Sequence, residues 1–237
     1  MLPAPLAVYR RLLEAYGAQG WWPVTPSGGR RPRYRPGGCG RLAERQRLEV
    51  CLGAILTQNT SWGNVEKALA RLHEAGVRDL EGVLAQPARR LQGLIRPSGY
   101  FRQKAKKLKA FARHLAGCGG KVGPWLGGDL RQRREELLGL YGVGPETADS
   151  ILLYAGGRPS FVVDAYTLRI GARLGWFRKA SYHQAQSYLT RRLPEDAGLY
   201  NEFHALFVEH AKARCRKAAP LCQGCPLREV CRYGGAR

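Results

Sequence analysis

The chain has 237 residues, 44% of them hydrophobic and 9% aromatic, so it is long and apolar enough to fold around a core of its own. Its 39 lysines and arginines outnumber 18 aspartates and glutamates, and the formal net charge of +21 favours an anionic polymer, nucleic acid first, as a partner. The N-terminal stretch carries charges within its apolar pattern and has no apolar run of about 20 residues, so we expect neither a membrane span nor a signal peptide. An arginine-rich proteome is the alternative explanation of the charge.

The first elements expected are a helix and an irregular loop. Residues 5–16 place apolar side chains on one side of a helix, namely Leu6, Tyr9, Leu12 and Leu13. Residues 17–40 are dense in glycine, proline and arginine, which predicts a solvated basic loop that includes the stretch from Arg30 to Arg35. The paired Trp21 and Trp22 are the exception, because they are too apolar to be left in water without a reason.

From Leu42 onward, apolar residues recur at helical spacing almost continuously as far as Gly142. The only β-like stretch, residues 161–163, is too short to imply a sheet. There is no fixed-period repeat and no long linker, so any two domains must pack closely. The expected fold class is therefore all-α.

The segment from Leu140 to Ala148 is predicted to end one helix, turn on two glycines and begin another helix at Pro145. Backbone amides of such a turn form a concave site that suits a DNA phosphate without reading sequence. An ordinary interhelical turn is the alternative. The DNA-binding residues expected here are Gly142, Val143, Gly144 and Thr147.

Asp164 follows the apolar stretch 161–163 directly and precedes another predicted helix. In isolation it is a good N-cap for that helix. A carboxylate at this place can also serve chemistry, because it stabilises positive charge and accepts a proton from water.

The seven cysteines are unevenly distributed. Their odd number without an export signal favours a reducing compartment, and Cys39, Cys51 and Cys118 are scattered. The other four are separated by six, two and five residues, a pattern that can hold zinc or a 4Fe-4S cluster: Cys215, Cys222, Cys225 and Cys231. Free thiols are the third possibility.

Together these motifs resemble the helix-hairpin-helix DNA glycosylase superfamily, in particular its endonuclease III-like members with an iron–sulfur loop. The resemblance covers roughly residues 42 to 231. It implies that the hairpin binds phosphates, that Asp164 is the catalytic carboxylate serving an extruded nucleotide, and that the cysteines hold a 4Fe-4S cluster. It also extends to the segment from Leu56 to Thr60, whose Gln58 would fill the gap left by the flipped base.

The resemblance implies two closely packed helical domains. A six-helix barrel with the helix-hairpin-helix would span residues 41–158. A helical iron–sulfur domain formed from both termini would comprise residues 159–237, with residues 1–40, the N-terminal helix and basic loop, packing against it. We expect a monomeric, cytoplasmic and nucleoid-associated protein that binds double-stranded DNA containing a damaged base and has no membrane partner.

The sequence departs from the family pattern at Glu146. Bifunctional relatives have a lysine there that forms an imine with the sugar, and a carboxylate cannot do so, which puts AP lyase activity in doubt. The surrounding residues are similar to a monofunctional branch with 3-methyladenine-type glycosylases. Cationic alkylated purines suit aromatic walls and an acid such as Glu146. The candidate walls of the base pocket are Trp21, Trp22, Trp62 and Tyr141, although packing in the core explains each of them equally well.

Three functions follow. The first is a base-excision glycosylase. A measurement of its lyase activity would distinguish a monofunctional enzyme from a bifunctional one that acts on oxidised pyrimidines. The second is a catalytically silent DNA-binding iron–sulfur protein, which has no chemical need for Asp164. The third is an unrelated helical zinc protein that binds RNA, which metal analysis distinguishes.

Overall fold

The computed structural model describes residues 2–36 and 42–235. Cys39 lies outside these ranges. Within them the chain is helical, and the only β contact is an isolated bridge between Val24 and Arg33. The predicted all-α class is confirmed, and residues 161–163 form no strand. No helix in the described part of the chain combines the length and the apolar character needed to cross a membrane.

The chain divides into two units. The central unit comprises residues 22–34 and 42–158, and the terminal unit comprises residues 2–21, 35–36 and 159–235. The boundary near residue 158 lies between the hairpin and Asp164 in the sequence, so each unit holds one of the two predicted functional motifs.

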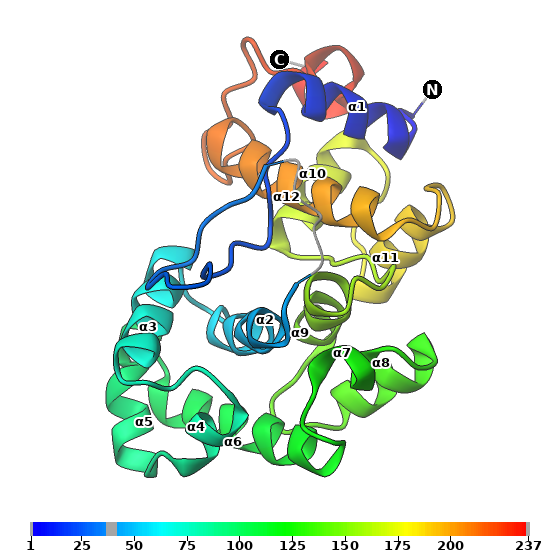
Figure 1. Cartoon of the computed structure of the whole chain (residues 1–237). Helices are drawn as coiled ribbons and strands as arrows, with labels where there is room; N and C mark the ends of the chain where they lie inside the picture. Colours follow the sequence, from blue (N-terminus) through cyan, green and yellow to red (C-terminus); the bar gives the residue numbers. More distant parts are fainter. Residues whose placement is uncertain (1, 37–41, 236–237) are drawn as a thin grey trace. The chain divides into compact units, whose positions relative to one another are not determined.

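The central unit is built around α2 (Glu44–Leu56), whose residues from Leu48 to Leu56 are all buried. A helix that is buried on every side over this length must be surrounded, and α2 lies in the middle of the unit in Figure 1. The helices that follow are α3 (Trp62–Glu74), α4 (Leu80–Ala85), α5 (Ala88–Leu94), the 3-10 turn η1 (Arg96–Ser98), α6 (Phe101–Gly117), α7 (Val122–Leu126), α8 (Leu130–Leu138), α9 (Pro145–Ser150) and the π-helical turn η2 (Ile151–Ala155).

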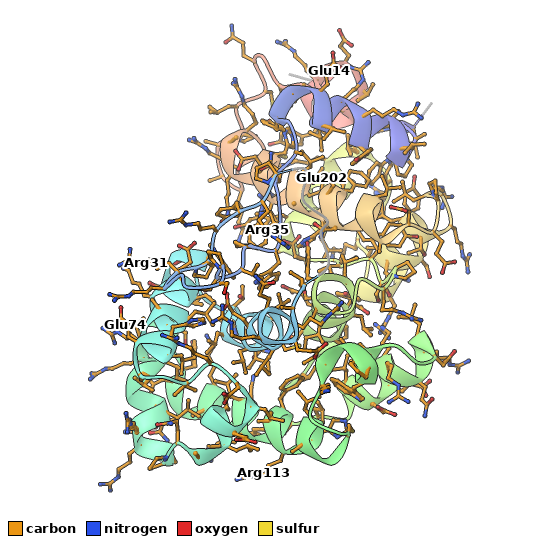
Figure 2. All side chains as sticks on the ribbon, in the orientation of Figure 1. Glu14, Arg31, Arg35, Glu74, Arg113 and Glu202 are labelled. Carbon is orange, nitrogen blue, oxygen red and sulfur yellow. The ribbon has the colours of Figure 1, made fainter. Side chains whose placement is uncertain are left out.

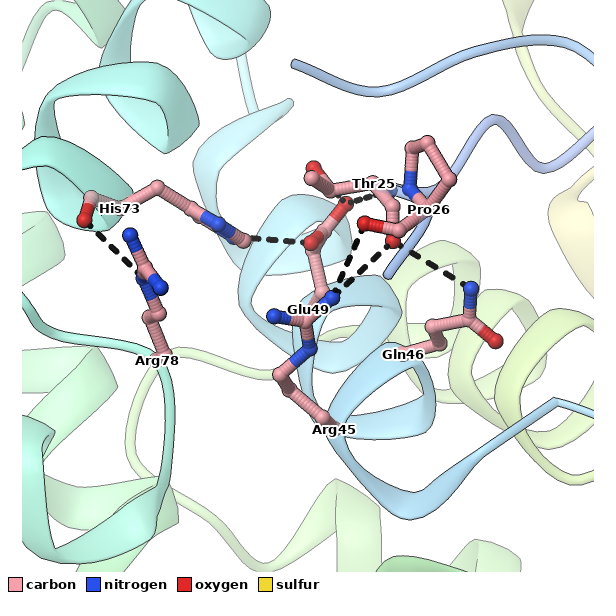
Figure 3. Close-up of polar contacts among 7 residues, drawn as sticks. All are labelled: Thr25, Pro26, Arg45, Gln46, Glu49, His73 and Arg78. Atoms are coloured by element: carbon pink, nitrogen blue, oxygen red, sulfur yellow. Dashed lines mark hydrogen bonds and ion pairs between the residues drawn. The ribbon is translucent and has the colours of Figure 1, made fainter. Parts of the chain in front are cut away.

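A buried polar cluster attaches residues 22–34 to α2 and α3 (Figure 3). Glu49 is only 4% exposed, and its Oε1 accepts hydrogen bonds from the backbone N of Thr25 at 2.7 Å and from its Oγ1 at 3.0 Å. The other oxygen lies 2.9 Å from Nε2 of the buried His73. These contacts explain why residues 22–34 belong to the central unit, whereas we expected all of residues 1–40 to pack with the cluster domain.

The terminal unit combines α1 (Pro5–Tyr16) with α10 (Ala165–Leu174), α11 (Tyr182–Thr190), α12 (Ala197–Ala213), the 3-10 turn η3 (Arg228–Val230) and α13 (Arg232–Gly235). The predicted N-terminal helix has the expected bounds, and it buries Val8 and Leu12. Tyr9 packs edge to face on Phe203 of α12, with ring centroids 5.5 Å apart. Residues from the two ends of the chain therefore share one core.

Several charged side chains extend from the ribbon in Figure 2. In the central unit, Glu74 and Arg113 extend away from the ribbon, and both are exposed. Few charges are buried, and those that are have specific polar contacts, which is the usual condition for a charge inside a protein.

Candidate functional site

The hairpin connects α8 to α9. Gly142 is exposed with a φ of +76°, a left-handed conformation that favours glycine, and Pro145 begins α9. Val143 is 7% exposed and anchors the turn, since its N donates to the carbonyl of Leu140 at 3.0 Å. The helix end, turn and helix start predicted from the sequence are therefore present.

Gln58 is brought directly onto this hairpin, although many residues separate them in the sequence. Its Nε2 donates to the carbonyl of Gly142 at 3.0 Å and to Oγ1 of Thr147 at 2.9 Å. The next residue, Asn59, has a φ of +53°, which is uncommon without glycine and is found in functional loops. The two segments predicted to contact DNA thus form one surface of the central unit.

Two lysines of α6 were not recognised as part of this arrangement. Nζ of Lys107 donates to Oε1 of Gln58 at 2.5 Å. Nζ of Lys104 donates to the carbonyls of Leu56 at 2.8 Å and Ser98 at 2.6 Å. The contacts with Gln58 and Leu56 join residues that are 49 and 48 positions apart in the chain, so the sequence gives no indication of them.

Four lysines of α6 look alike in the sequence, but Lys104 is not available to DNA. Its side chain is buried, with the residue 2% exposed, so it cannot reach a phosphate. Lys109 is half-buried and donates to the carbonyl of Leu84 at 2.5 Å. Lys106 is exposed.

The predicted aromatic residues occupy three different settings. Trp22 is 7% exposed and packs edge to face on Trp62 at 5.1 Å and against Tyr154 at 5.1 Å. Tyr141 is 56% exposed on the hairpin, and its hydroxyl donates to Oε1 of Gln103 at 3.0 Å. Trp21 is half-buried and belongs to the terminal unit.

Tyr100 is an exposed aromatic that the sequence analysis did not single out. It is 70% exposed, and its φ of +43° places it in the left-handed region immediately before α6. A bulky residue in that conformation is an outlier whose cost must be offset by its surroundings. The combination of high exposure and a strained backbone would have been invisible from composition or periodicity.

Asp164 is the N-cap of α10, as its position before a helix predicted. Oδ1 accepts from the backbone N of Thr167 at 2.7 Å and from its Oγ1 at 2.9 Å. Oδ2 lies 3.7 Å from Nε2 of the buried His204 on α12, and 14% of the Asp164 side chain is exposed. Burial favours the protonated acid, but the contacts with His204 and Thr167 outweigh burial and lower the pKa of Asp164 below its ordinary value. The group is thus held as a carboxylate.

The four C-terminal cysteines line one pocket of the terminal unit, formed between α10, the end of α12 and α13. The pocket is bordered by positive charge: Nη1 of Arg173 donates to Sγ of Cys215 at 3.0 Å. Among the described residues no three potential ligands converge on a point suited to a single metal ion.

A neutral histidine lies beside these thiols. Burial, and then the positive charge of Arg214, lowers the pKa of His210 to about 4. Its Nδ1 shares a hydrogen bond of 2.9 Å with the hydroxyl of Tyr16 from α1, whose pKa is raised to about 12 by burial and by Cys225. The N-terminal helix thus participates in the surroundings of the cysteine pocket.

Comparison with known proteins places this arrangement in a family. The model of the HhH-GPD superfamily of base excision DNA repair proteins matches residues 52–195, which include the Gln58 segment, the hairpin and Asp164. The chain belongs to this superfamily. A putative DNA repair glycosylase of Methanocaldococcus jannaschii is 42% identical over 94% of each chain. Endonuclease III of Thermotoga maritima is 33% identical over 80% of this chain and 84% of that one.

Solved structures agree with the HhH-GPD assignment. A trapped covalent intermediate of endonuclease III with DNA superposes with a TM-score of 0.71 at 27% identity, covering 83% of this chain and 88% of that one. Helicobacter pylori 3-methyladenine DNA glycosylase bound to 1,N6-ethenoadenine has the same fold, with a TM-score of 0.71 at 24% identity over 89% and 98% of the two chains. The predicted family is confirmed: this HhH-GPD protein is an endonuclease III-like DNA glycosylase of base excision repair.

Proposed function

We propose that this HhH-GPD protein is a monofunctional DNA N-glycosylase that hydrolyses the bond between a damaged, extruded base and its sugar. The observation that carries the proposal is the environment of Asp164. Cleavage of an N-glycosidic bond develops positive charge on the sugar, as in the oxocarbenium-like transition state of glycosidases. A carboxylate whose pKa is held low remains negative and stabilises that charge.

The two oxygens of Asp164 have different tasks in this mechanism. Oδ1 is committed to the Thr167 backbone and hydroxyl, which fixes the orientation of the carboxylate. Oδ2, near His204, is the oxygen through which Asp164 acts on the sugar or accepts a proton from the attacking water. His204 would then be a positioning residue that keeps the carboxylate ionised.

Glu146 supports the monofunctional assignment. It is exposed in the first turn of α9, at the place where an imine-forming lysine would stand in bifunctional relatives, and a carboxylate cannot form an imine. The bifunctional alternative rests on the relatives named endonuclease III, and it would need another amine, such as the exposed Lys121.

We propose that DNA is held by phosphate contacts at the hairpin residues Gly142, Val143, Gly144 and Thr147, with Gln58 filling the space left by the extruded base. The hydrogen bonds of Gln58 with Gly142 and Thr147 join the two segments in one surface, which supports this assignment. For the base we propose a cationic alkylated purine recognised by Trp21, Trp22, Trp62 and Tyr141, with Glu146 contributing negative charge. The edge-to-face pair of Trp22 and Trp62 supports an aromatic environment.

We further propose that Cys215, Cys222, Cys225 and Cys231 hold a structural 4Fe-4S cluster. The support for this proposal is that all four thiols line one pocket of the terminal unit, and four cysteine thiolates are a ligand set that a 4Fe-4S cluster accepts. The bound cluster would brace the surrounding basic residues, and base hydrolysis requires no electron from it.

The test is a panel of duplexes, each with one defined lesion, read separately for base release and for strand nicking. We expect base release from an alkylated purine with little nicking, and loss of base release by orders of magnitude in Asp164→Asn, which removes the charge while DNA binding survives. Borohydride should trap little covalent adduct. Efficient trapping would establish the bifunctional alternative, and unchanged base release by Asp164→Asn would refute the role of this carboxylate.

A further inference from the structure

Lys107 occupies an unusual place beside the hairpin. It is half-buried on α6, and a Cβ built on Gly142 would overlap with the carbons of its side chain. Its ammonium contacts Oε1 of Gln58 at 2.5 Å, and no carboxylate of the described residues forms an ion pair with it. The charge of Lys107 is therefore directed at one neutral amide.

This contact determines which way the Gln58 amide points. An ammonium only donates hydrogen bonds, so it must face the amide oxygen, and a carbonyl only accepts, so Gly142 must face the amide nitrogen. Two neighbours on different elements thus demand the same orientation. Both N–H groups of the amide are used, by Gly142 and Thr147, and one lone pair of Oε1 remains.

We propose that Lys107 is a positioning residue that fixes the orientation of Gln58, so that Gln58 meets the base opposite the extruded nucleotide as a hydrogen-bond acceptor. This inference rests on the proposed function only in placing Gln58 against DNA. Its physical basis is that a charge-assisted hydrogen bond is stronger than a neutral one, so it holds the amide against flipping. Lys107 thereby contributes to the choice of opposite base without touching it.

The experiment uses a duplex with a tetrahydrofuran abasic analogue opposite 2-aminopurine, whose fluorescence reports the surroundings of the unpaired base. Wild type is compared with Lys107→Met, Gln58→Ala and the double variant, and Lys106→Met serves as control because Lys106 is an exposed lysine of the same helix. Thermal unfolding of each variant verifies that it is folded. We expect Lys107→Met and Gln58→Ala each to weaken binding to this duplex about tenfold, a change typical of the loss of a hydrogen bond to a charged group.

The double variant decides whether Lys107 acts through Gln58. If it does, Lys107→Met has little further effect once Gln58 is alanine, and the fluorescence change is lost equally in all three variants. Binding measured with each of the four bases opposite the analogue should differ less in Lys107→Met than in wild type. Equal losses in Lys107→Met and Lys106→Met, additive losses in the double variant, or no fluorescence change with wild type would each overturn the proposal.

This assay involves no base excision, so it separates the two hypotheses. A wild-type protein that changes the fluorescence of 2-aminopurine but releases no base from any lesion would refute the proposed function while leaving the role of Lys107 intact. Base release without coupling between Lys107 and Gln58 would support the proposed function and refute the role of Lys107.

Discussion

Replacing Lys104 with methionine tests how a buried charge is held beneath the Gln58 segment. Burial, with a smaller effect of Lys107, lowers the pKa of Lys104 from 10.5 to about 8, and the residue is 2% exposed. Below pH 8 the group is charged in both the folded and the unfolded chain, so the folded state carries the full cost of burying it. Between the two pKa values the folded chain loses this proton first, and the cost is relieved as the pH rises.

The expected magnitude follows from the size of the shift. At pH 9.5 the folded pKa is exceeded by about 1.5 units, and at 1.36 kcal/mol per unit this corresponds to about 2 kcal/mol. A neutral amine still has two N–H groups for the carbonyls of Leu56 and Ser98, so the contacts survive deprotonation. Between pH 7 and 9.5 the unfolding free energy of wild type should therefore rise by about 2 kcal/mol relative to that of Lys104→Met.

Urea unfolding at a series of pH values measures this difference directly, because titrations common to both proteins cancel. Lys106→Met is the control, since Lys106 is exposed and should show no such relative change. A difference between wild type and Lys104→Met that stays constant or falls with rising pH would refute the reasoning.

Three further outcomes are expected. Because the pKa of Asp164 lies below its ordinary 3.8, base release should show no acid limb from this carboxylate above about pH 4, and a rate that declines with an apparent pKa near 5 would contradict this. Natively prepared protein should contain iron and absorb visible light, and Cys222→Ser should lose both together with order in the C-terminal segment, whereas zinc without iron would exclude the cluster. The logarithm of DNA affinity should fall steeply with the logarithm of salt concentration, and a flat dependence would rule out dominant phosphate contacts.

The elements that could be predicted from the sequence are those with local causes. The apolar spacing of residues 5–16 and the proline at position 5 define α1, which the structure shows with the same bounds. Asp164 has the chemistry of an N-cap and is one, because its oxygen needs only the amide three residues later. The two hairpin glycines likewise act within a few residues of one another.

The place of residues 22–34 in the central unit could not be predicted from such local causes. Composition correctly identified an irregular segment, but its place depends on contacts with α2, among them those of the buried carboxylate of Glu49, which binds Thr25 and contacts His73. In the sequence Glu49 is one acid in a helix with no sign that it is buried. Only the fold shows that its partners come from the loop before the helix and from the helix after it.

The lysines of α6 show that the role of a charged residue, too, cannot be predicted from the sequence alone. Lys104, Lys106, Lys107 and Lys109 look equivalent in sequence, yet a rotation of about 100° per residue gives each a different neighbour. One is buried against two carbonyls, one is exposed, one holds Gln58 and one binds the carbonyl of Leu84. Because counterions are displaced only by cations that reach a phosphate, the salt dependence of DNA binding must be smaller than the net charge of +21 would suggest. Lys104, which DNA does not reach, instead donates to the carbonyls of Leu56 and Ser98.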